Sequence, residues 1–318
     1  MSTTTPPTEH TAGHTAGHTD GHTAGHTDAH TAPTTEPTVR RAPQGTAAAL
    51  PSLARVAWAR TVLELRQFFR ERDAVVFIFA YPLIMLAIFA TVFGQGGATV
   101  GPEPGIPFAQ YFLPGMVATG VMLSSFQNLA LSIAVERDEG GLKRLRGTPM
   151  PPAAYFLGKI GSVLLTSAIQ MVLLIGLGSL AFGIDLPTTA DKWLTFAWVF
   201  VLGTAAGAVC GVAFSSVPRS GRSASAVVTP IVLVLQFISG VFFIFNDLPT
   251  WMQRVAEIFP LKWLAQGMRS VFLPEEAEAF EVSGSWQHEA TAAVLVAYLV
   301  VGLVLGVRTF RWQRRDDG

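Results

Sequence analysis

Six long apolar stretches dominate the last three-quarters of the chain. They run approximately over residues 74–94, 111–135, 157–183, 193–217, 225–245 and 291–307. Each is long enough to cross the ~30 Å hydrocarbon layer of a bilayer as a helix. The one charged side chain within them is Lys159, which lies close enough to a span end for its ammonium group to reach the interface. The pattern therefore predicts an all-α integral membrane protein with six transmembrane helices.

The basic residues are distributed unevenly between the two sides of this predicted bundle. Six crossings place both termini on one side, and 18 of the 22 Lys and Arg residues fall there. The other side carries Lys192, Arg254, Lys262 and Arg269. Because cytoplasmic segments of membrane proteins carry the excess of Lys and Arg, we expect both termini to be cytoplasmic. The expected location is the plasma (inner) membrane, with membrane lipid as a partner and no nucleic acid.

An amphipathic segment, PSLARVAWARTVLELRQFFRER (residues 51–72), precedes the first span. Its apolar side chains recur at helical spacing and are flanked by arginines: Trp58, Val62, Leu65 and Phe69. We expect an interfacial helix that lies flat at the cytoplasmic surface of the membrane. The alternative is an ordinary solvated helix, which would not need such long apolar side chains.

The segment between the fifth and sixth spans is apolar but is broken by Pro249, Pro260 and Pro274. Its pieces are too short to cross a bilayer. We expect short extracytoplasmic helices that dip into the outer leaflet or form a lid. Trp251 and Trp263 suit the aromatic belt at that surface.

Both ends of the chain differ from the apolar part. Residues 1–50 are rich in Thr, Pro, Ala and Gly, and we expect them to form a disordered cytoplasmic tail. This tail carries a histidine at every fourth position: His10, His14, His18, His22, His26 and His30. Metal sequestration by these imidazoles and an expanded repeat without a ligand both remain open. Residues 311–318 form a basic cytoplasmic tail, so the membrane domain is expected over residues 51–310.

Small and polar residues inside the spans indicate packing. Gly203, Gly207 and Gly211 share one face of the fourth span, which lets another helix approach closely in the same chain or in a second one. Pro82, Pro114 and Pro230 predict kinks in the first, second and fifth spans. The spans also contain four amides, which favour hydrogen bonds between helices, with substrate contact as the alternative: Gln127, Asn128, Gln170 and Gln236.

The composition offers little for catalysis. Charged residues make up 14% of the chain, Cys210 is the single cysteine, and His288 is the one histidine outside the tail. The sequence has no H-E-x-x-H motif, no carboxylate pair within a span and no phosphate-binding G-x-x-x-x-G-K-[ST] loop. We therefore expect a non-enzyme without a cofactor of its own. If the protein pumps, another polypeptide must supply the energy.

Against this background, one connection is densely charged. Residues 136–146 read ERDEGGLKRLR, with seven charged side chains among eleven, between the second and third spans. A helix here could dock into a partner, with charges setting the register and Leu142 and Leu145 filling a groove. The TPMPP that follows would end such a helix abruptly. The alternative is a solvated loop that only satisfies the positive-inside rule.

Two stretches resemble a known family. ERDEGGLKRLRGTPMPPAAYFLGK is similar to the signature of type-2 ABC transporter permeases at Glu136, Glu139, Gly141, Leu142, Leu145, Thr148, Pro149, Gly158 and Lys159. The stretch after the fifth span is similar at Ser239, Gly240, Phe243, Leu248, Pro249, Trp251, Pro260, Leu261 and Arg269. The resemblance covers about residues 55–310 and is closest to permeases of the daunorubicin-resistance type.

The resemblance implies the membrane half of an ABC exporter. Such permeases pair with a second copy or a related permease, and each is driven by a separate ATPase subunit that binds ATP and Mg. The implied cargo is amphipathic or hydrophobic and drug-like, whereas other members export lipids, polysaccharides or sodium. A passive channel or membrane scaffold is the rival from another class.

The resemblance also identifies two segments at the cytoplasmic side. The 55–72 helix corresponds to the connecting helix. The implied coupling helix and its flanks comprise Glu136, Arg137, Glu139, Gly141, Leu142, Lys143, Arg144, Leu145, Thr148 and Pro149. The Gly140-Gly141 pair departs from the family pattern, and we expect the extra glycine to loosen the start of that helix.

Overall fold

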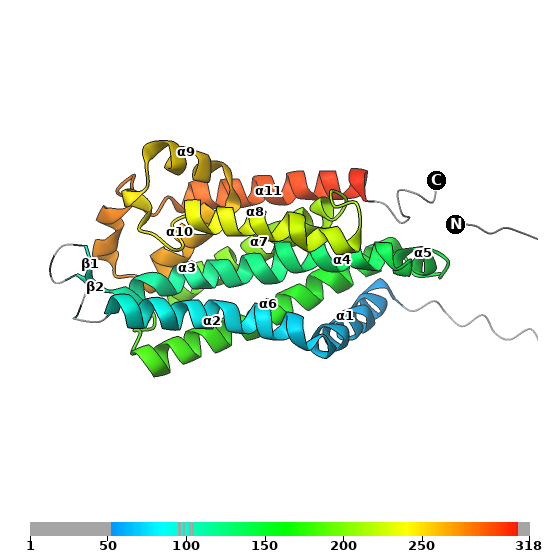
Figure 1. The fold of residues 1–318 in the computed structure, drawn as a ribbon, viewed down its shortest axis with the longest axis horizontal. Helices are drawn as coiled ribbons and strands as arrows, with labels where there is room; N and C mark the ends of the chain where they lie inside the picture. The colour runs from blue at the N-terminus through cyan, green and yellow to red at the C-terminus, as the bar shows by residue number, and fades with distance from the viewer. Residues whose placement is uncertain (1–51, 95–96, 98, 102, 104, 311–318) are drawn as a thin grey trace, which may run out of the picture. The chain divides into compact units, whose positions relative to one another are not determined.

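The computed structural model describes residues 52–94, 97, 99–101, 103 and 105–310. Within them, six helical runs are long and apolar enough to cross a membrane, as predicted (Figure 1). They are α2 (Arg72–Gly94), the run α3–η1–α4 (Phe108–Asp138), α6 (Pro152–Phe182), α7 (Ala190–Phe214), α8 (Gly221–Ile238) and α11 (His288–Thr309). The predicted tails, including the six spaced histidines, lie outside the described residues.

The second span is the central one. Its most apolar window is 83% buried, the largest share among the six candidate spans of the described chain. The run consists of α3 (Phe108–Met122), the π-helix η1 (Leu123–Gln127) and α4 (Asn128–Asp138). The hydroxyls of Ser124 and Ser125 donate to the carbonyls of Gly120 and Val121, which supports the widened turn. The sequence predicted a proline kink in this span and not a π-helix.

The fifth span is shorter than predicted. The helix α8 ends at Ile238, whereas the apolar pattern extends to residue 245. Gly240 has φ +71°, and a Cβ there would stand 2.8 Å from the Cβ of Phe245, so the chain can turn back sharply at this glycine. Val241 and Phe242 are buried in the turn. The end of the apolar stretch therefore fills the core instead of extending the span.

The glycine face of α7 packs within the same chain. A Cβ on Gly203 would meet Leu264 of α10 (Pro260–Phe272). Gly207 lies against Ser125 of the π-helix. A Cβ on Gly211 would stand 2.6 Å from the carbonyl oxygen of Phe126. The glycine face of α7 therefore contacts α10 and the central span of the same chain.

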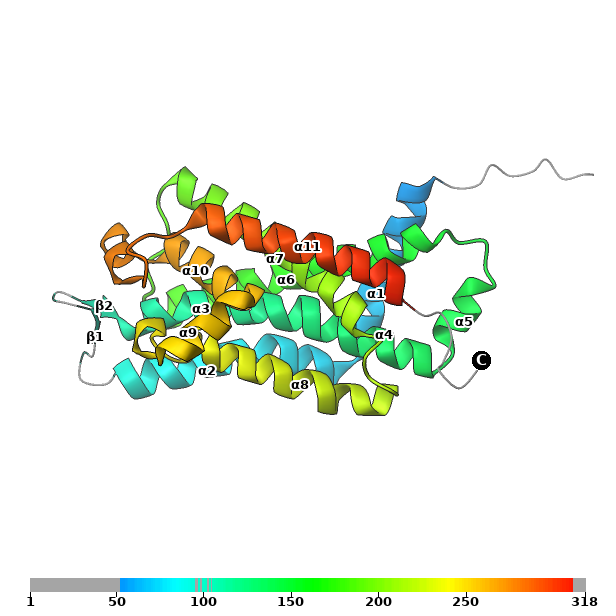
Figure 2. The same cartoon turned by 90° about the horizontal axis from the view of Figure 1, so that it is seen from above.

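The segment between α8 and α11 forms two α-helices, α9 (Thr250–Ile258) and α10, with the 3₁₀ turns η2 (Phe245–Asp247) and η3 (Glu275–Phe280). The prediction of short helices is confirmed, but α10 is core and not a lid. Its residues from Leu261 to Phe272 are all buried, and it packs against α3, α7 and α11 (Figure 2). Trp251 is 64% exposed, as an interfacial residue should be. Trp263 is buried instead, with Lys262 Nζ 3.6 Å above its ring, so the aromatic-belt prediction was wrong for it.

The two ends of the bundle differ. One end carries a small hairpin that the sequence did not predict, β1 (Thr99–Val100) paired antiparallel with β2 (Ile106–Pro107). We call it the hairpin end. The opposite end carries α1 (Leu53–Arg70) and α5 (Gly141–Arg146), and the C-terminal end of α11 lies there too (Figure 1). Because the connection between the second and third spans belongs to it, we call it the elbow end.

Candidate functional site

The charged connection forms a compact elbow, which we define as residues 136–149. The helix α4 ends at Asp138, α5 begins at Gly141, and α6 starts after the prolines at Pro152. Gly140 has φ +75°, a conformation that glycine adopts without strain. A Cβ on Gly141 would stand 3.1 Å from the carbonyl oxygen of Glu136. The two glycines thus make a tight reversal between helices, and the expected loosening of the helix start stays a prediction.

Two predicted coupling residues are buried within the chain. Leu142 is 0% exposed and packs in a cluster with Leu129, Ile133 and Tyr155. It therefore holds α5 against α4 and α6, and it cannot fill a groove of a partner as predicted. Arg137 is also buried, and its guanidinium donates to the carbonyl oxygens of Ser215 (2.9 Å) and Pro218 (3.0 Å). This arginine ties α4 to the α7–α8 connection instead of contributing to the surface.

The remaining predicted residues form the outer face of the elbow. Leu145 and Glu136 are half-buried. Gly141 is half-buried too, and the exposed ones are Glu139, Lys143, Arg144, Thr148 and Pro149. Arg146, which was not among the predicted residues, is also exposed. The hydroxyl of Thr148 donates to the carbonyl of Leu145 at 2.7 Å, which closes the end of α5. The elbow therefore presents a polar, mostly basic surface on a fixed base.

A buried ion-pair cluster lies directly behind the elbow. Lys159 of α6 is 2% exposed, and its Nζ lies 2.7 Å from Oε2 of Glu64 on α1. It also donates to Glu136 at the end of α4, and Tyr155 donates to the same carboxylate at 2.9 Å. Arg60 pairs with Glu64 and lies 5.3 Å above the ring of Tyr155. The expectation that Lys159 reaches the interface was wrong, because two carboxylates neutralise it in place.

One face of the helix α1 carries the charged residues of this cluster, and the neighbouring face is apolar. Two glycines on α6 allow α1 to approach closely. Gly158 lies against Arg60, and a Cβ on Gly161 would stand 2.6 Å from the hydroxyl of Thr61. The predicted stripe lies next to this buried face. Trp58 is 63% and Phe69 47% exposed, whereas Val62 and Leu65 are half-buried. Sequence periodicity found the apolar stripe but missed the buried polar face, since Glu64 alone carries no signal of a partner.

Comparison with known proteins decides the family. The family described as "ABC-2 type transporter" matches residues 55–273, from α1 to the end of α10. The chain belongs to this family. The inner membrane transport permease YadH of Escherichia coli (strain K12) is 23% identical over 193 residues, covering 60% of this chain and 74% of YadH. The probable multidrug ABC transporter permease YbhR of the same strain is 21% identical over 173 residues, covering 54% of this chain and 46% of YbhR.

Membership in this family places the described geometry in context. The chain is a multi-pass plasma membrane protein and a permease subunit of an ABC transporter, and membership implies an ABC ATPase partner in general. The elbow and α1 both lie within the matched residues. The buried cluster of Lys159 thus joins the two segments that the sequence resemblance identified as the coupling helix and the connecting helix.

The interhelical amides of this ABC-2 permease fall into two groups. Gln170 donates to the carbonyl of Ile78 at 2.6 Å, and Gln236 accepts a hydrogen bond of 2.9 Å from Tyr81. The expectation of hydrogen bonds between helices is confirmed for these two. Within the described residues, the side chains of Gln127 and Asn128 have no hydrogen-bond partner. The contact alternative therefore stays open for this second pair.

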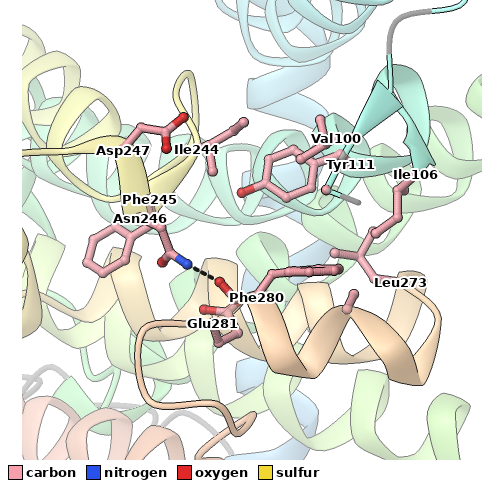
Figure 3. A pocket seen from close by; sticks show the side chains of 12 residues that line it. Val100, Ile106, Tyr111, Ile244, Phe245, Asn246, Asp247, Leu273, Phe280 and Glu281 are labelled. Atoms are coloured by element: carbon pink, nitrogen blue, oxygen red, sulfur yellow. Dashed lines mark hydrogen bonds between the residues drawn. The ribbon is translucent and has the colours of Figure 1, made fainter. Parts of the chain in front are cut away.

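The hairpin end of the permease contains a separate pocket of about 330 Å³. Figure 3 shows the rings of Tyr111 and Phe280 on its wall, with Asn246 donating to the carbonyl of Phe280. Glu281 lines the pocket and binds Arg269 through two hydrogen bonds of 2.5 and 3.1 Å. Burial lowers the pKa of Arg269, but the carboxylate of Glu281 more than offsets it and leaves this pKa above its usual value. The pair locks α10 to the turn before α11.

Proposed function

We propose that this permease subunit works in an ATP-driven exporter, and that a separate ATPase subunit drives it through the elbow. One observation carries the proposal: the exposed basic face of α5 stands on a base that is ion-paired to α1 and α6 and hydrogen-bonded to the α7–α8 connection. Such a base transmits a push on α5 to several helices at once. ATP and Mg are then bound by the partner and not by this chain.

The mechanical path runs through named contacts. Leu142 fixes α5 to the cluster that includes Tyr155 of α6. Glu136 joins the end of α4 to Lys159, and Glu64 brings in α1. A buried ion pair is stable only while its charged groups stay close together. The end of α4, together with α1, α5 and α6, should therefore move as a unit. We infer that closure of the partner ATPases moves this unit relative to the rest of the bundle.

The cargo and the assembly are parts of the same proposal. The outer faces of α2, α8 and α11 expose large apolar side chains, which suits lipid and a second permease copy or a related permease. YbhR is described as a probable multidrug permease. This supports an amphipathic or hydrophobic, drug-like cargo leaving the cytoplasm. Export of a lipid, a polysaccharide or sodium is the alternative within the family.

The decisive experiment reverses charge on the elbow surface. The double substitution Lys143→Glu and Arg144→Glu is expected to abolish ATP-driven transport by the permease with its ATPase, while membrane insertion stays normal. The matched control is Arg254→Glu on α9, an exposed arginine of the segment between α8 and α11. Normal transport by the double variant would rule out a coupling role for the elbow. Transport that continues in ATP-depleted vesicles would favour the passive channel.

A further inference from the structure

A long groove separates the junction of α1 and α2 from the central span. Its volume is about 530 Å³. One wall comes from the end of α1 and the start of α2, between Gln67 and Ile78, and the other runs from Leu123 to Glu139. At ~1.5 Å of rise per residue, the second wall extends over about 24 Å of helix axis. The groove thus has the length of an elongated organic molecule.

The two ends of the groove differ in polarity. The deep end, away from the elbow, is lined by the apolar side chains of Phe77, Ile78 and Leu123. The end nearest the elbow is lined by Arg70 and by the carboxylates of Glu71 and Glu139, with Glu136 beside them. An occupant must therefore be amphipathic. Its apolar body would lie deep, and its polar end would face the elbow.

An amide without a partner lies inside the groove. Gln127 lines it, is 7% exposed, and has no hydrogen bond to any described residue. The polar atoms of its amide are not among the fully enclosed atoms that lack a partner, so the amide is accessible from the groove and can hydrogen-bond to an occupant. Gln127 is also the last residue of the π-helix, and such widened turns occur frequently at functional sites. Asn128 follows it on the same wall.

The charges at the groove's polar end favour a cation. Glu136 is already ion-paired with Lys159 and accepts a hydrogen bond from Tyr155. Glu71 and Glu139 are exposed, and neither has an ion pair with a described residue. Arg70 supplies one positive charge against these two carboxylates. The remaining excess is negative.

We propose that this groove binds an amphipathic organic cation, with its charged head near Glu71 and Glu139 and with Gln127 hydrogen-bonded to it. The proposal rests on the proposed function, because it makes the groove the place where the exporter takes up cargo at its elbow end. It goes further in naming the site and the charge of the cargo. A membrane lipid and a second copy of the chain are the other possible occupants, and the test below separates them.

Binding is measured on the full-length chain in phosphatidylcholine nanodiscs without ATPase. The probe is the cationic amphipath rhodamine 6G, followed by fluorescence anisotropy, with the anionic amphipath anilinonaphthalene sulfonate for comparison. The cation is expected to bind at least ~10-fold more tightly than the anion. Gln127→Leu should raise the Kd for the cation by about 5- to 10-fold, the effect of one lost hydrogen bond in a buried site.

Two further variants keep the test independent of folding. Glu71→Gln with Glu139→Gln changes only exposed side chains and should reduce the preference for the cation by about 5-fold or more. Its matched control is Glu276→Gln, an exposed glutamate of η3 between α10 and α11, which should leave binding unchanged. Ser132→Trp fills the groove and should abolish binding of the cation.

Several outcomes would overturn the proposal. They are an unchanged Kd for both the Gln127 and the glutamate variants, or equal binding of cation and anion. Displacement of the dye by phosphatidylglycerol from the parent and all variants alike would assign the groove to lipid. A Ser132→Trp variant that binds dye normally but loses its dimer would assign it to a second copy. None of these results bears on transport lost through charge reversal at Lys143 and Arg144, so the proposed function stands or falls separately.

Discussion

The ammonium group of Lys159 lies 2.7 Å from a carboxylate oxygen of Glu64, and both side chains are more than nine-tenths buried. The two residues are 95 positions apart in the chain and belong to α6 and α1. Glu136 completes the cluster from α4. A buried charge is tolerated only with such partners. The orientation of α1 on the bundle is therefore set by electrostatics as well as by apolar packing.

Removal of the lysine should be costly. Lys159→Met leaves Glu64 and Glu136 close together with Arg60 as the one cation beside them, so we expect a loss of about 3–5 kcal/mol in the free energy of unfolding. Denaturant unfolding in detergent micelles, followed by circular dichroism, measures it. Arg222→Met, at an exposed position of α8, should change the value by less than ~0.5 kcal/mol. Equal stability of the Lys159 variant and the parent would show that the cluster contributes nothing.

The close contact between α7 and the π-helix predicts a contrast between two glycines. Gly211→Ala forces a methyl group against the carbonyl oxygen of Phe126, and backbone cannot move aside cheaply, so a loss of ~1–3 kcal/mol is expected. Gly176 of α6 has no neighbour within 4 Å of an added Cβ. Gly176→Ala should be neutral or stabilising by up to ~1 kcal/mol, because alanine favours the helix. Equal thermal midpoints for the two variants would contradict the intramolecular packing of this stripe.

Lys262 predicts an unusual pH dependence of stability. Burial, together with Arg269, lowers the pKa of Lys262 to about 8, against the opposing effect of Glu281 and Glu257. Between that value and the ~10.4 of an unfolded lysine, the unfolded state binds more protons, so stability rises with pH. Below pH 8 the ammonium group is charged in both states, and the cost of burying it is fully present.

The thermal midpoint should therefore rise between about pH 8 and ~pH 10.4. Lys262→Met should remove most of this rise and increase stability at pH 7 by a few kcal/mol at most. Differential scanning fluorimetry in detergent measures both effects. Lys192→Met serves as the control lysine and should retain the rise. A midpoint that falls steadily over this range in the parent would refute the interpretation.

Arg137 predicts a graded series at the α7–α8 connection. Arg137→Met deprives the carbonyls of Ser215 and Pro218 of their donor in a buried place, so we expect a loss of ~2–3 kcal/mol. Lysine keeps the charge but lacks the planar guanidinium group with its several donors, so Arg137→Lys should recover only part of the lost stability. Unfolding in urea distinguishes the three proteins. A methionine variant as stable as the parent would mean that these hydrogen bonds are not needed to hold the connection.

Some features of the elbow were predictable and others were not. Its position, its charge and the stop at Pro149 follow from local composition, because turn residues and charges act on the backbone nearby. Which of its residues face outward did not follow. Leu142 and Leu145 are three positions apart on a short helix, yet only Leu142 is fully buried, since α4 and α6 flank one side of α5. Gln127 was one of four equivalent amides until the neighbouring helices paired Gln170 and Gln236.

The sequence by itself determined the class of the molecule: six spans, a basic amphipathic helix before them and short helices between the last two. Length and hydrophobicity decide these because a bilayer acts on each segment separately. Tertiary structure alone decided that α10 fills the centre of the bundle, that Lys159 is shared by Glu64 and Glu136, and that a groove opens beside the π-helix. These features depend on which distant segments meet, and the physical reason they escape a sequence pattern is that the energy of a buried charge or amide resides in its partner.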